Sequence, residues 1–189
     1  MTHALPPIQG VHHTAFRCRD AEETRHFYED VLGLKLAAAL AFDTEPGSDK
    51  PMRYMHLFFQ LGDGRFVAFF DWPGSAQPQM FDRASGFDLH LALEMDDMEA
   101  LSAYRARLRE HGYKAIGPIE HDFVRSVYCY DPNGIQVEVT VRTPEHDAII
   151  AKEGAEARDV IRDWTEETRP AKAHLWPDGA PPPGAAVAG

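Results

Sequence analysis

The chain has 189 residues, of which 44% are hydrophobic and 26% are charged, a composition typical of one globular domain. Acidic residues number 30 against 19 basic ones, and the net charge of −11 argues against binding to nucleic acid or to an anionic membrane surface. Two cysteines without CxxC spacing argue against a disulfide framework and a thiolate zinc site. No signal peptide or membrane span is expected, and these features together predict a cytoplasmic protein.

A pattern of eight residues occurs twice, 77 positions apart. Residues 13–20 read HTAFRCRD and residues 90–97 read HLALEMDD, and both follow the scheme His-x-Ala-x-charged-x-x-Asp. Each copy precedes a helix-like stretch and three strand-like runs, the last two joined by a tight turn. The alternative is chance similarity between two amphipathic units, but agreement of so many features in one order favours a true repeat.

The first unit is predicted to contain a strand, a helix and three further strands. The helix is expected over 21–34, with Asp20 as N-cap, Glu23 in a capping box and Gly33 at its end. The strands are expected in LKLAAAL, MRYMHLFFQ and RFVAFFD, with a polar loop at 42–51 between the first two and an LGDG turn before the third.

The second unit is predicted to repeat this order. Its helix is expected over 98–113, capped by Asp96 or Asp97 and ended at Gly112. Its strands are expected in KAIGPI, FVRSVYCY and IQVEVTV, with a DPNG turn joining the last two.

The chain is therefore predicted to be an α+β protein. Two βαβββ modules, at about 8–75 and 86–142, form a domain over 1–143 with a curved mixed sheet around a metal site. The remainder, 144–189, has apolar residues at helical spacing that predict one or two helices packed on the domain or on a partner. From Pro170 the Pro-, Ala- and Gly-rich sequence predicts a loose arm.

Strand alternation places three polar side chains on one face. Leucines flank His90 and point to the side of the sheet that the predicted helix covers, so His90 points to the opposite side. The repeat predicts the same orientation for His13. Valines flank Glu138 and point to the apolar side of the sheet, so the Glu138 side chain points to the same side as His90. If the sheets curve around a common hollow, these two histidines and one carboxylate form the ligand set of a non-haem Fe(II) site with open positions. The alternatives are packed or surface histidines and a glutamate on a solvated face.

The repeat also predicts that a fourth ligand position carries no ligand. Aligning Gly64 with Gly134 makes Ala68 the counterpart of Glu138. The site is then expected to have three protein ligands, which leaves room for water, substrate or oxygen.

The opening HHTAFRCRDAEETRHFYEDVLGLKL resembles that of the vicinal oxygen chelate superfamily, which includes glyoxalases, bleomycin- and fosfomycin-resistance proteins and extradiol ring-cleavage dioxygenases. The resemblance covers about residues 8–142 and implies paired βαβββ modules. The stretch IEHDFVRSVYCYDPNGIQVE (119–138) is similar to the type I extradiol dioxygenase signature. The matching positions are His121, Val127, Tyr128, Asp131, Pro132, Gly134 and Glu138.

This resemblance implies a metal-dependent enzyme that opens a catechol-type ring with O2. Fe(II) would be held by His13, His90 and Glu138, with Mn, Zn, Ni or Co as alternative metals. Tyr128 would hydrogen-bond a catecholate oxygen, and His121 would line the substrate side and steady the intermediate. The alternatives for these two residues are a packed aromatic side chain and a loop histidine.

One departure concerns the acid–base residue. Enzymes of this type usually carry a further histidine on the last strand of the first half, where this chain has RFVAFFD without one. His56, on the preceding strand, is the nearest candidate, because the glycine alignment pairs it with Ser126 and places it on the inward face. An acid–base role and a structural role both fit His56. His12 is expected to point away from His13 and is excluded from the ligands.

Three functions are compared. The first is the extradiol dioxygenase, whose partners would be a small aromatic diol and O2 in aromatic-compound catabolism. The second is a redox-neutral glyoxalase-like isomerase, lyase or thiol transferase, which usually needs four protein ligands, so Ala68 counts against it. The third is a metal-free resistance protein that binds a small molecule, against which the three ligand-competent residues count. A homodimer is expected from the resemblance.

Overall fold

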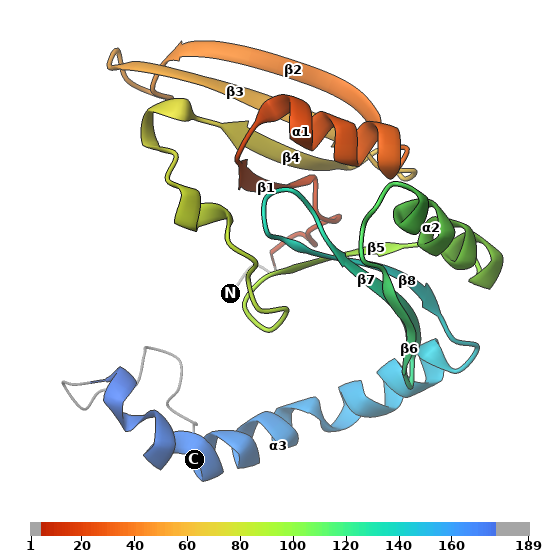
Figure 1. Cartoon of the computed structure of the whole chain (residues 1–189). Helices are drawn as coiled ribbons and strands as arrows, with labels where there is room; N and C mark the ends of the chain where they lie inside the picture. Colours follow the sequence, from red (N-terminus) through yellow and green to blue (C-terminus); the bar gives the residue numbers. More distant parts are fainter. Residues whose placement is uncertain (1–4, 177–189) are drawn as a thin grey trace. The chain divides into compact units, whose positions relative to one another are not determined.

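The structure is a computed structural model that describes residues 5–176. The chain divides into two compact units. The first runs up to His121 and includes Arg125–Val141, and the second comprises Asp122–Val124 and the chain from Arg142 onward. The first unit holds the two sheets with α1 and α2, and the second holds α3 (Figure 1).

The first unit consists of two βαβββ modules, so the predicted α+β fold is confirmed (Figure 1). Each module has a four-stranded mixed sheet, with strand order β1-β4-β3-β2 in module 1 and β5-β8-β7-β6 in module 2. Module 1 contains β1 (His13–Cys18), α1 (Ala21–Arg25), η1 (His26–Val31), β2 (Lys35–Thr44), β3 (Pro51–Gln60) and β4 (Phe66–Asp71). Module 2 contains β5 (His90–Glu94), α2 (Met98–Glu110), β6 (Ile116–His121), β7 (Val124–Tyr130) and β8 (Gln136–Arg142). Two short 3₁₀ turns lie between the modules, η2 (Pro73–Ser75) and η3 (Pro78–Phe81).

Strand register confirms how the two modules correspond. The first strand of each module runs parallel to the last, with Ala15 opposite Ala68 in module 1 and Ala92 opposite Glu138 in module 2. Ala15 and Ala92 are equivalent in the repeat. Their strand partners are therefore equivalent too, and Ala68 occupies in module 1 the place that Glu138 occupies in module 2.

Both helices begin as their sequences predict. The Asp20 carboxylate accepts from the Glu23 backbone N–H at 2.8 Å, and Asp97 caps α2 in the same way through Ala100, also at 2.8 Å. The Glu23 side chain does not complete a capping box but pairs with Arg19 at 2.6 Å. Gly33 and Gly112 follow the two helices with φ of 77° and 83°, a conformation that glycine adopts without strain.

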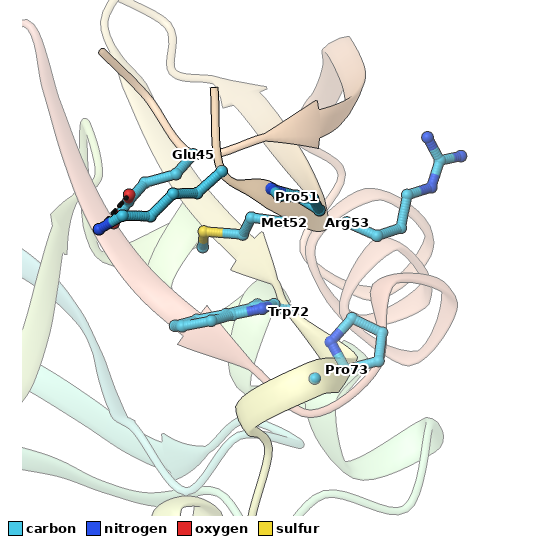
Figure 2. Close-up of a pocket in the computed structure, with 8 residues that line it drawn as sticks. Glu45, Pro51, Met52, Arg53, Trp72 and Pro73 are labelled. Atoms are coloured by element: carbon cyan, nitrogen blue, oxygen red, sulfur yellow. Dashed lines mark ion pairs between the residues drawn. The ribbon is translucent and has the colours of Figure 1, made fainter. Parts of the chain in front are cut away.

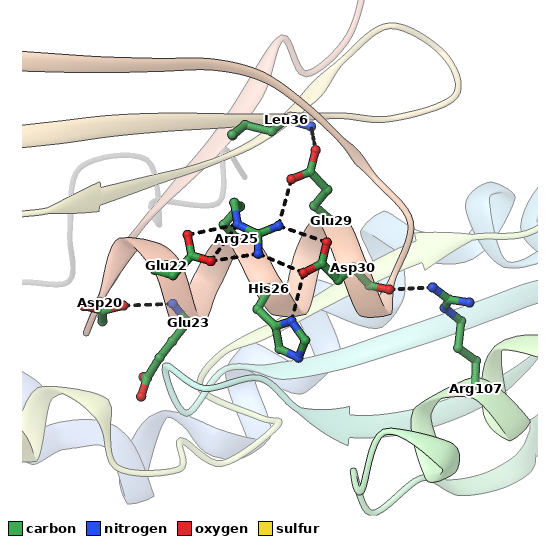
Figure 3. A network of polar contacts seen from close by, with 9 residues as sticks. All are labelled: Asp20, Glu22, Glu23, Arg25, His26, Glu29, Asp30, Leu36 and Arg107. Carbon is green, nitrogen blue, oxygen red and sulfur yellow. Dashed lines mark hydrogen bonds and ion pairs between the residues drawn. The ribbon is translucent and has the colours of Figure 1, made fainter.

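The first helix departs from a regular α-helix after Arg25. Residues His26–Val31 form a π-helical segment, whose wider turn lets Phe27, Tyr28 and Val31 all reach the core. On the solvent side, Arg25 hydrogen-bonds the carboxylates of Glu22, Glu29 and Asp30 (Figure 3). Hydrogen bonds from Arg25 and then from His26 lower the pKa of Asp30 well below its usual range. This network holds the irregular helix in place.

The core is shared by both modules. Tyr28 packs on Phe59 and Phe69 with ring centroids 5.3 and 4.7 Å away, and valines of β7 and β8 belong to the same buried cluster. The Tyr28 hydroxyl also donates to the buried carboxylate of Asp131 in the turn before β8, at 3.1 Å. Buried polar and apolar contacts therefore join the two halves of the repeat.

Two segments differ from their predictions. The stretch 42–51 is not all loop, because β2 continues to Thr44 and β3 begins at Pro51. The second difference is at Pro170, which lies inside α3 (His146–Lys172) rather than starting an arm. A proline this close to the helix end removes few backbone hydrogen bonds. The helix is followed by η4 (Ala173–Leu175), and the rest of the predicted arm lies outside the described residues.

The C-terminal helix buries none of its described residues. Its apolar side chains at Ile150, Val160, Ile161 and Trp164 are between 48% and 65% exposed. Packing of this helix on the domain or on a partner stays a prediction. Across residues 5–176, no helix is both long and apolar enough to cross a membrane.

Candidate functional site

Module 2 brings His90 and Glu138 together on the inward face of its sheet. The Nε2 atom of His90 lies 3.9 Å from Oε2 of Glu138. On the other side of the ring, Nδ1 of His90 lies 2.7 Å from the carbonyl oxygen of Gly86. A carbonyl oxygen only accepts, so Nδ1 of His90 donates this hydrogen bond and Nε2 faces Glu138. This is the orientation that a metal-ligating histidine has in proteins.

The Glu138 carboxylate is buried and accepts a hydrogen bond from Ser126, whose hydroxyl is also bonded to Thr140. Ser126 Oγ donates to Oε1 of Glu138 at 2.5 Å, and Ser126 Oγ also lies 2.8 Å from Thr140 Oγ1. The other carboxylate oxygen, Oε2, is the one that faces Nε2 of His90 at 3.9 Å. Sequence reasoning identified Ser126 only as a counterpart of His56 and missed this contact, although the serine lies on the same strand face as Tyr128.

Tyr128 and His121 form a second pair in module 2. The Tyr128 hydroxyl lies 2.8 Å from Nε2 of His121, which ends β6. Burial raises the pKa of Tyr128, as does the nearby Glu138 carboxylate, while a hydrogen bond with Ser126 works against the increase. The phenol therefore stays protonated at neutral pH and can donate a hydrogen bond.

Module 1 carries His13 and His56. Their ring centroids are 6.2 Å apart, and the ring of His56 stacks on Phe70 at 3.8 Å and lies 4.1 Å from Phe58. The neighbours of His56 along β3 alternate as predicted, because Leu57 and Phe59 are buried in the core on the helix side. His56 therefore faces away from the helices.

The Nε2 atom of His56 is buried and has no hydrogen-bond partner within residues 5–176. The repeat explains this. In module 2 the counterpart of His56 is Ser126, which binds the Glu138 carboxylate. In module 1 the carboxylate position is Ala68, so His56 has no equivalent group to bind. Burial, and to a smaller degree the charge of His13, lowers the pKa of His56. The imidazole is thus held neutral at pH 7 with one ring nitrogen free.

His12 lies beside His13, contrary to the prediction. Nδ1 of His12 is 2.9 Å from Nδ1 of His13, and the two rings meet edge to face at a centroid distance of 5.2 Å. Strand alternation does not govern this pair, because β1 begins at His13. The predicted orientation of His12 was therefore wrong, while its exclusion from the metal ligands stays a prediction.

The predicted site residues thus fall into two half-sites. Module 2 gathers His90, Glu138, Tyr128 and His121, and module 1 places His13 with His56. Within residues 5–176, no three His, Cys, Asp or Glu side chains are grouped closely enough to hold a metal ion. Convergence of His13 with His90 and Glu138 stays a prediction. The donor types themselves, imidazole nitrogens and a carboxylate, suit a divalent metal.

A separate hollow of about 460 Å³ opens at the other end of β4 (Figure 2). Met52, Trp72 and Pro73 form its walls, and an ion pair between Lys50 and Glu45 at 3.6 Å borders it. None of the predicted site residues lines this hollow.

The chain matches a known family over most of the two modules. The profile of the Glyoxalase/Bleomycin resistance protein/Dioxygenase superfamily covers residues 10–139. The chain belongs to this superfamily. Its members include metal-dependent enzymes and resistance proteins, so membership by itself does not choose the reaction.

Individual relatives of this superfamily member carry different activities. A lactoylglutathione lyase from Neisseria meningitidis is 25% identical over 143 residues, which covers 72% of the chain and 94% of the relative. A putative ring-cleaving dioxygenase, MhqE from Bacillus subtilis, is 36% identical over 72 residues, 36% of the chain and 22% of that protein. The crystal structure of FosX from Listeria monocytogenes, a fosfomycin resistance protein complexed with Mn(II) and sulfate, has a TM-score of 0.54 and 18% identity, and the match covers 75% of this chain and 99% of that one.

Proposed function

We propose that the protein is an extradiol ring-cleavage dioxygenase that inserts both atoms of O2 into a catechol-type ring and breaks the carbon–carbon bond beside the two hydroxyls. The observation that carries the proposal is the Tyr128–His121 hydrogen bond next to the Glu138–His90 pair. These four residues include three positions of the extradiol signature, and they occur together in one module. The partial match to MhqE, a putative ring-cleaving dioxygenase, supports the same reaction.

The metal in this proposal is Fe(II), held by His13, His90 and Glu138. A bound Fe(II) ion would supply Lewis acidity toward both catechol oxygens and a path by which the electrons of the ring reach O2. Three protein ligands leave open positions for these two reactants, in agreement with the alanine at position 68. FosX of Listeria monocytogenes, which has the same fold, was solved with Mn(II), and this supports a divalent metal in general.

Proton handling falls to three side chains. The protonated Tyr128 hydroxyl can donate to a catecholate oxygen, and Nε2 of His121 lies where it can accept or return the phenolic proton. His56 is neutral at pH 7, and its free Nε2 can take a proton from the other hydroxyl. It would supply the acid–base group that the last strand of module 1 lacks.

The substrate ring would lie on the aromatic face of module 1. His56 already stacks on Phe70 with an interplanar angle of 21°, and Phe58 lies on the same face beside it. Flat, half-buried rings of this kind favour an aromatic substrate over a flexible chain. This face and the polar half-site of module 2 would bind opposite sides of the diol.

A homodimer would give the two half-sites a way to meet, with His13 of one copy beside His90 and Glu138 of the other. Mixing His13→Ala and Glu138→Ala chains tests this arrangement. Randomly paired dimers would restore iron at about one site in four, because each mixed dimer has one intact ligand set. A site formed within one chain would recover no iron on mixing, and light scattering would give the assembly size directly.

The second candidate is a redox-neutral lyase or isomerase. It is favoured by the lactoylglutathione lyase of Neisseria meningitidis, which the chain matches over 94% of that protein's length. Ala68 counts against it, since such enzymes usually use four protein ligands. A metal-free resistance protein is the third candidate, and the three ligand-competent residues His13, His90 and Glu138 count against it.

One experiment separates these functions. The protein is loaded with Fe(II) under anaerobic conditions and then supplied with O2 and a panel of substituted catechols in an oxygen electrode. Oxygen uptake with one O2 consumed per ring opened would support the dioxygenase. Turnover of lactoylglutathione without oxygen uptake would favour the lyase, and absence of metal binding together with tight binding of an aromatic compound would favour the resistance protein.

A further inference from the structure

The two equivalent histidines His13 and His90 differ in what holds their Nδ1 atoms. His90 Nδ1 donates to the carbonyl of Gly86, four residues before it, at 2.7 Å. The residue four positions before His13 is Gln9, whose carbonyl accepts from Arg65 Nη2 at 3.4 Å. In module 1 the neighbour of Nδ1 is instead the ring of His12, with 2.9 Å between the two Nδ1 atoms.

A hydrogen bond between two Nδ1 atoms allows two proton arrangements. If His13 donates, its Nε2 keeps a lone pair and can bind a metal. If His12 donates, His13 carries its proton on Nε2 and cannot bind a metal through that atom. The repeat favours the first arrangement, because His90 donates through Nδ1 in the equivalent place.

We propose that His12 is a positioning residue that fixes the ring and tautomer of His13. Its Nδ1 accepts the Nδ1–H of His13, does what the Gly86 carbonyl does for His90, and leaves Nε2 of His13 free as a metal ligand. The inference rests on the proposed metal site. It adds to the half-site of module 1 a residue that strand alternation had excluded.

His12 is held well enough to play this part. Its backbone carbonyl accepts from the Phe66 N–H at 3.1 Å, which extends the pairing of β1 and β4 by one residue. Its ring lies 5.6 Å from the ring of Phe66, the register partner of His13. A partner that both orients the ring and selects the tautomer raises the metal affinity of a ligating histidine.

The tautomer can be measured in the metal-free protein. Long-range ¹H–¹⁵N correlation spectra of ¹⁵N-labelled full-length chain distinguish an Nδ1–H ring from an Nε2–H ring. We expect His13 to be the Nδ1–H form in the wild type and in His12→Asn, whose Oδ1 can accept in place of Nδ1. In His12→Ala we expect His13 to change to the Nε2–H form, and in the control His174→Ala it should not change. An Nε2–H ring in the wild type, or no change in His12→Ala, would overturn the proposal.

Metal affinity provides the second readout. Anaerobic titration with Fe(II) alone should show binding weakened by roughly 10–100-fold in His12→Ala and restored in His12→Asn. Equal affinity in wild type and His12→Ala would refute the positioning role even if the tautomer changes. Failure of the wild type to bind Fe(II) would refute the proposed function instead, while the tautomer measurement would still report on the His12–His13 bond.

Discussion

The two βαβββ modules share strand order and register but differ in the chemistry of their inward faces. In module 2 the carboxylate of Glu138 is buried, held by Ser126 and accompanied by His90. In module 1 the carboxylate position is Ala68, and His56 stacks among phenylalanines with one nitrogen unpaired. In the proposed site, one copy of a repeated unit would provide most of the polar ligands, and the other would provide an aromatic face with a neutral base.

The two modules also differ in the residue that faces the carboxylate position. Ser126 and Glu138 satisfy each other in module 2, so the loss of the carboxylate in module 1 would leave a serine there with nothing to bind. Module 1 has His56 in place of that serine and gains ring stacking with Phe70. The Nε2 atom of His56 is buried without a partner within residues 5–176, and buried polar groups without a partner are often functional.

The largest expected effect comes from removing the carboxylate that only module 2 has. Glu138→Ala deletes the anionic ligand and leaves Ser126 bonded to Thr140, so the fold should persist while bound iron falls to background and turnover is lost. Iron per chain is measured by mass spectrometry, and folding by circular dichroism. The matched control is Glu120→Ala, which removes an exposed glutamate paired with Arg125 at 3.2 Å. Unchanged iron content in Glu138→Ala would refute the assignment.

The second-largest effect is expected from removing His56, the proposed base of module 1. His56→Ala should slow turnover by roughly two to four orders of magnitude with iron binding nearly intact, because it removes a proton acceptor and no ligand. His56→Phe is the sharper variant, since it keeps the stack on Phe70 and removes only the ring nitrogens. Oxygen uptake under saturating catechol measures both. A His56→Phe enzyme that works at the wild-type rate would show that the ring only packs.

A smaller loss is expected at the Tyr128–His121 pair. His121→Ala should reduce turnover by about 10–100-fold and Tyr128→Phe by about tenfold, at or below the lower end of the roughly 100- to 10,000-fold effects of positioned proton donors and acceptors. The two residues share one hydrogen bond, so the double variant should lose less than the product of the two single effects. Strictly multiplicative losses in steady-state oxygen uptake would show that the residues act separately.

The smallest effect concerns a feature that the modules have in common. Cys18 in β1 and Cys129 in β7 are both buried, and burial raises the pKa of each thiol to about 12. Because only the thiolate reacts, the native protein at pH 8 should resist iodoacetamide, whereas both thiols should react once it is unfolded. Mass spectrometry counts the added groups. Rapid alkylation of either native thiol would show that the core of its module opens readily.

Much of this comparison could be predicted from the sequence. Asp20 and Asp97 marked the helix starts, and the glycines of the two turns aligned Ala68 with Glu138 before the strand register confirmed it. Local rules were enough there, because caps, turns and strand alternation depend on a few neighbouring residues. The same rules put His56 on the face away from the helices.

Other features depend on contacts between distant residues. The π-helical segment arises where Phe27, Tyr28 and Val31 must all reach a core shared with module 2. Alternation misplaced His12, because the strand begins one residue later and the ring is free to turn toward His13. The hydrogen bond from Ser126 to Glu138 joins adjacent strands, and residue types alone do not reveal it.

The central claim is that two unequal modules contribute to one metal site, and His13 is the ligand through which module 1 does so. Anaerobic equilibrium dialysis of Fe(II) against the wild type and His13→Ala tests this most directly. We expect one iron per chain in the wild type and an affinity loss of at least about 100-fold in His13→Ala, beyond what the loss of an outer hydrogen-bond partner costs. A His13→Ala protein that binds Fe(II) as tightly as the wild type would contradict the account.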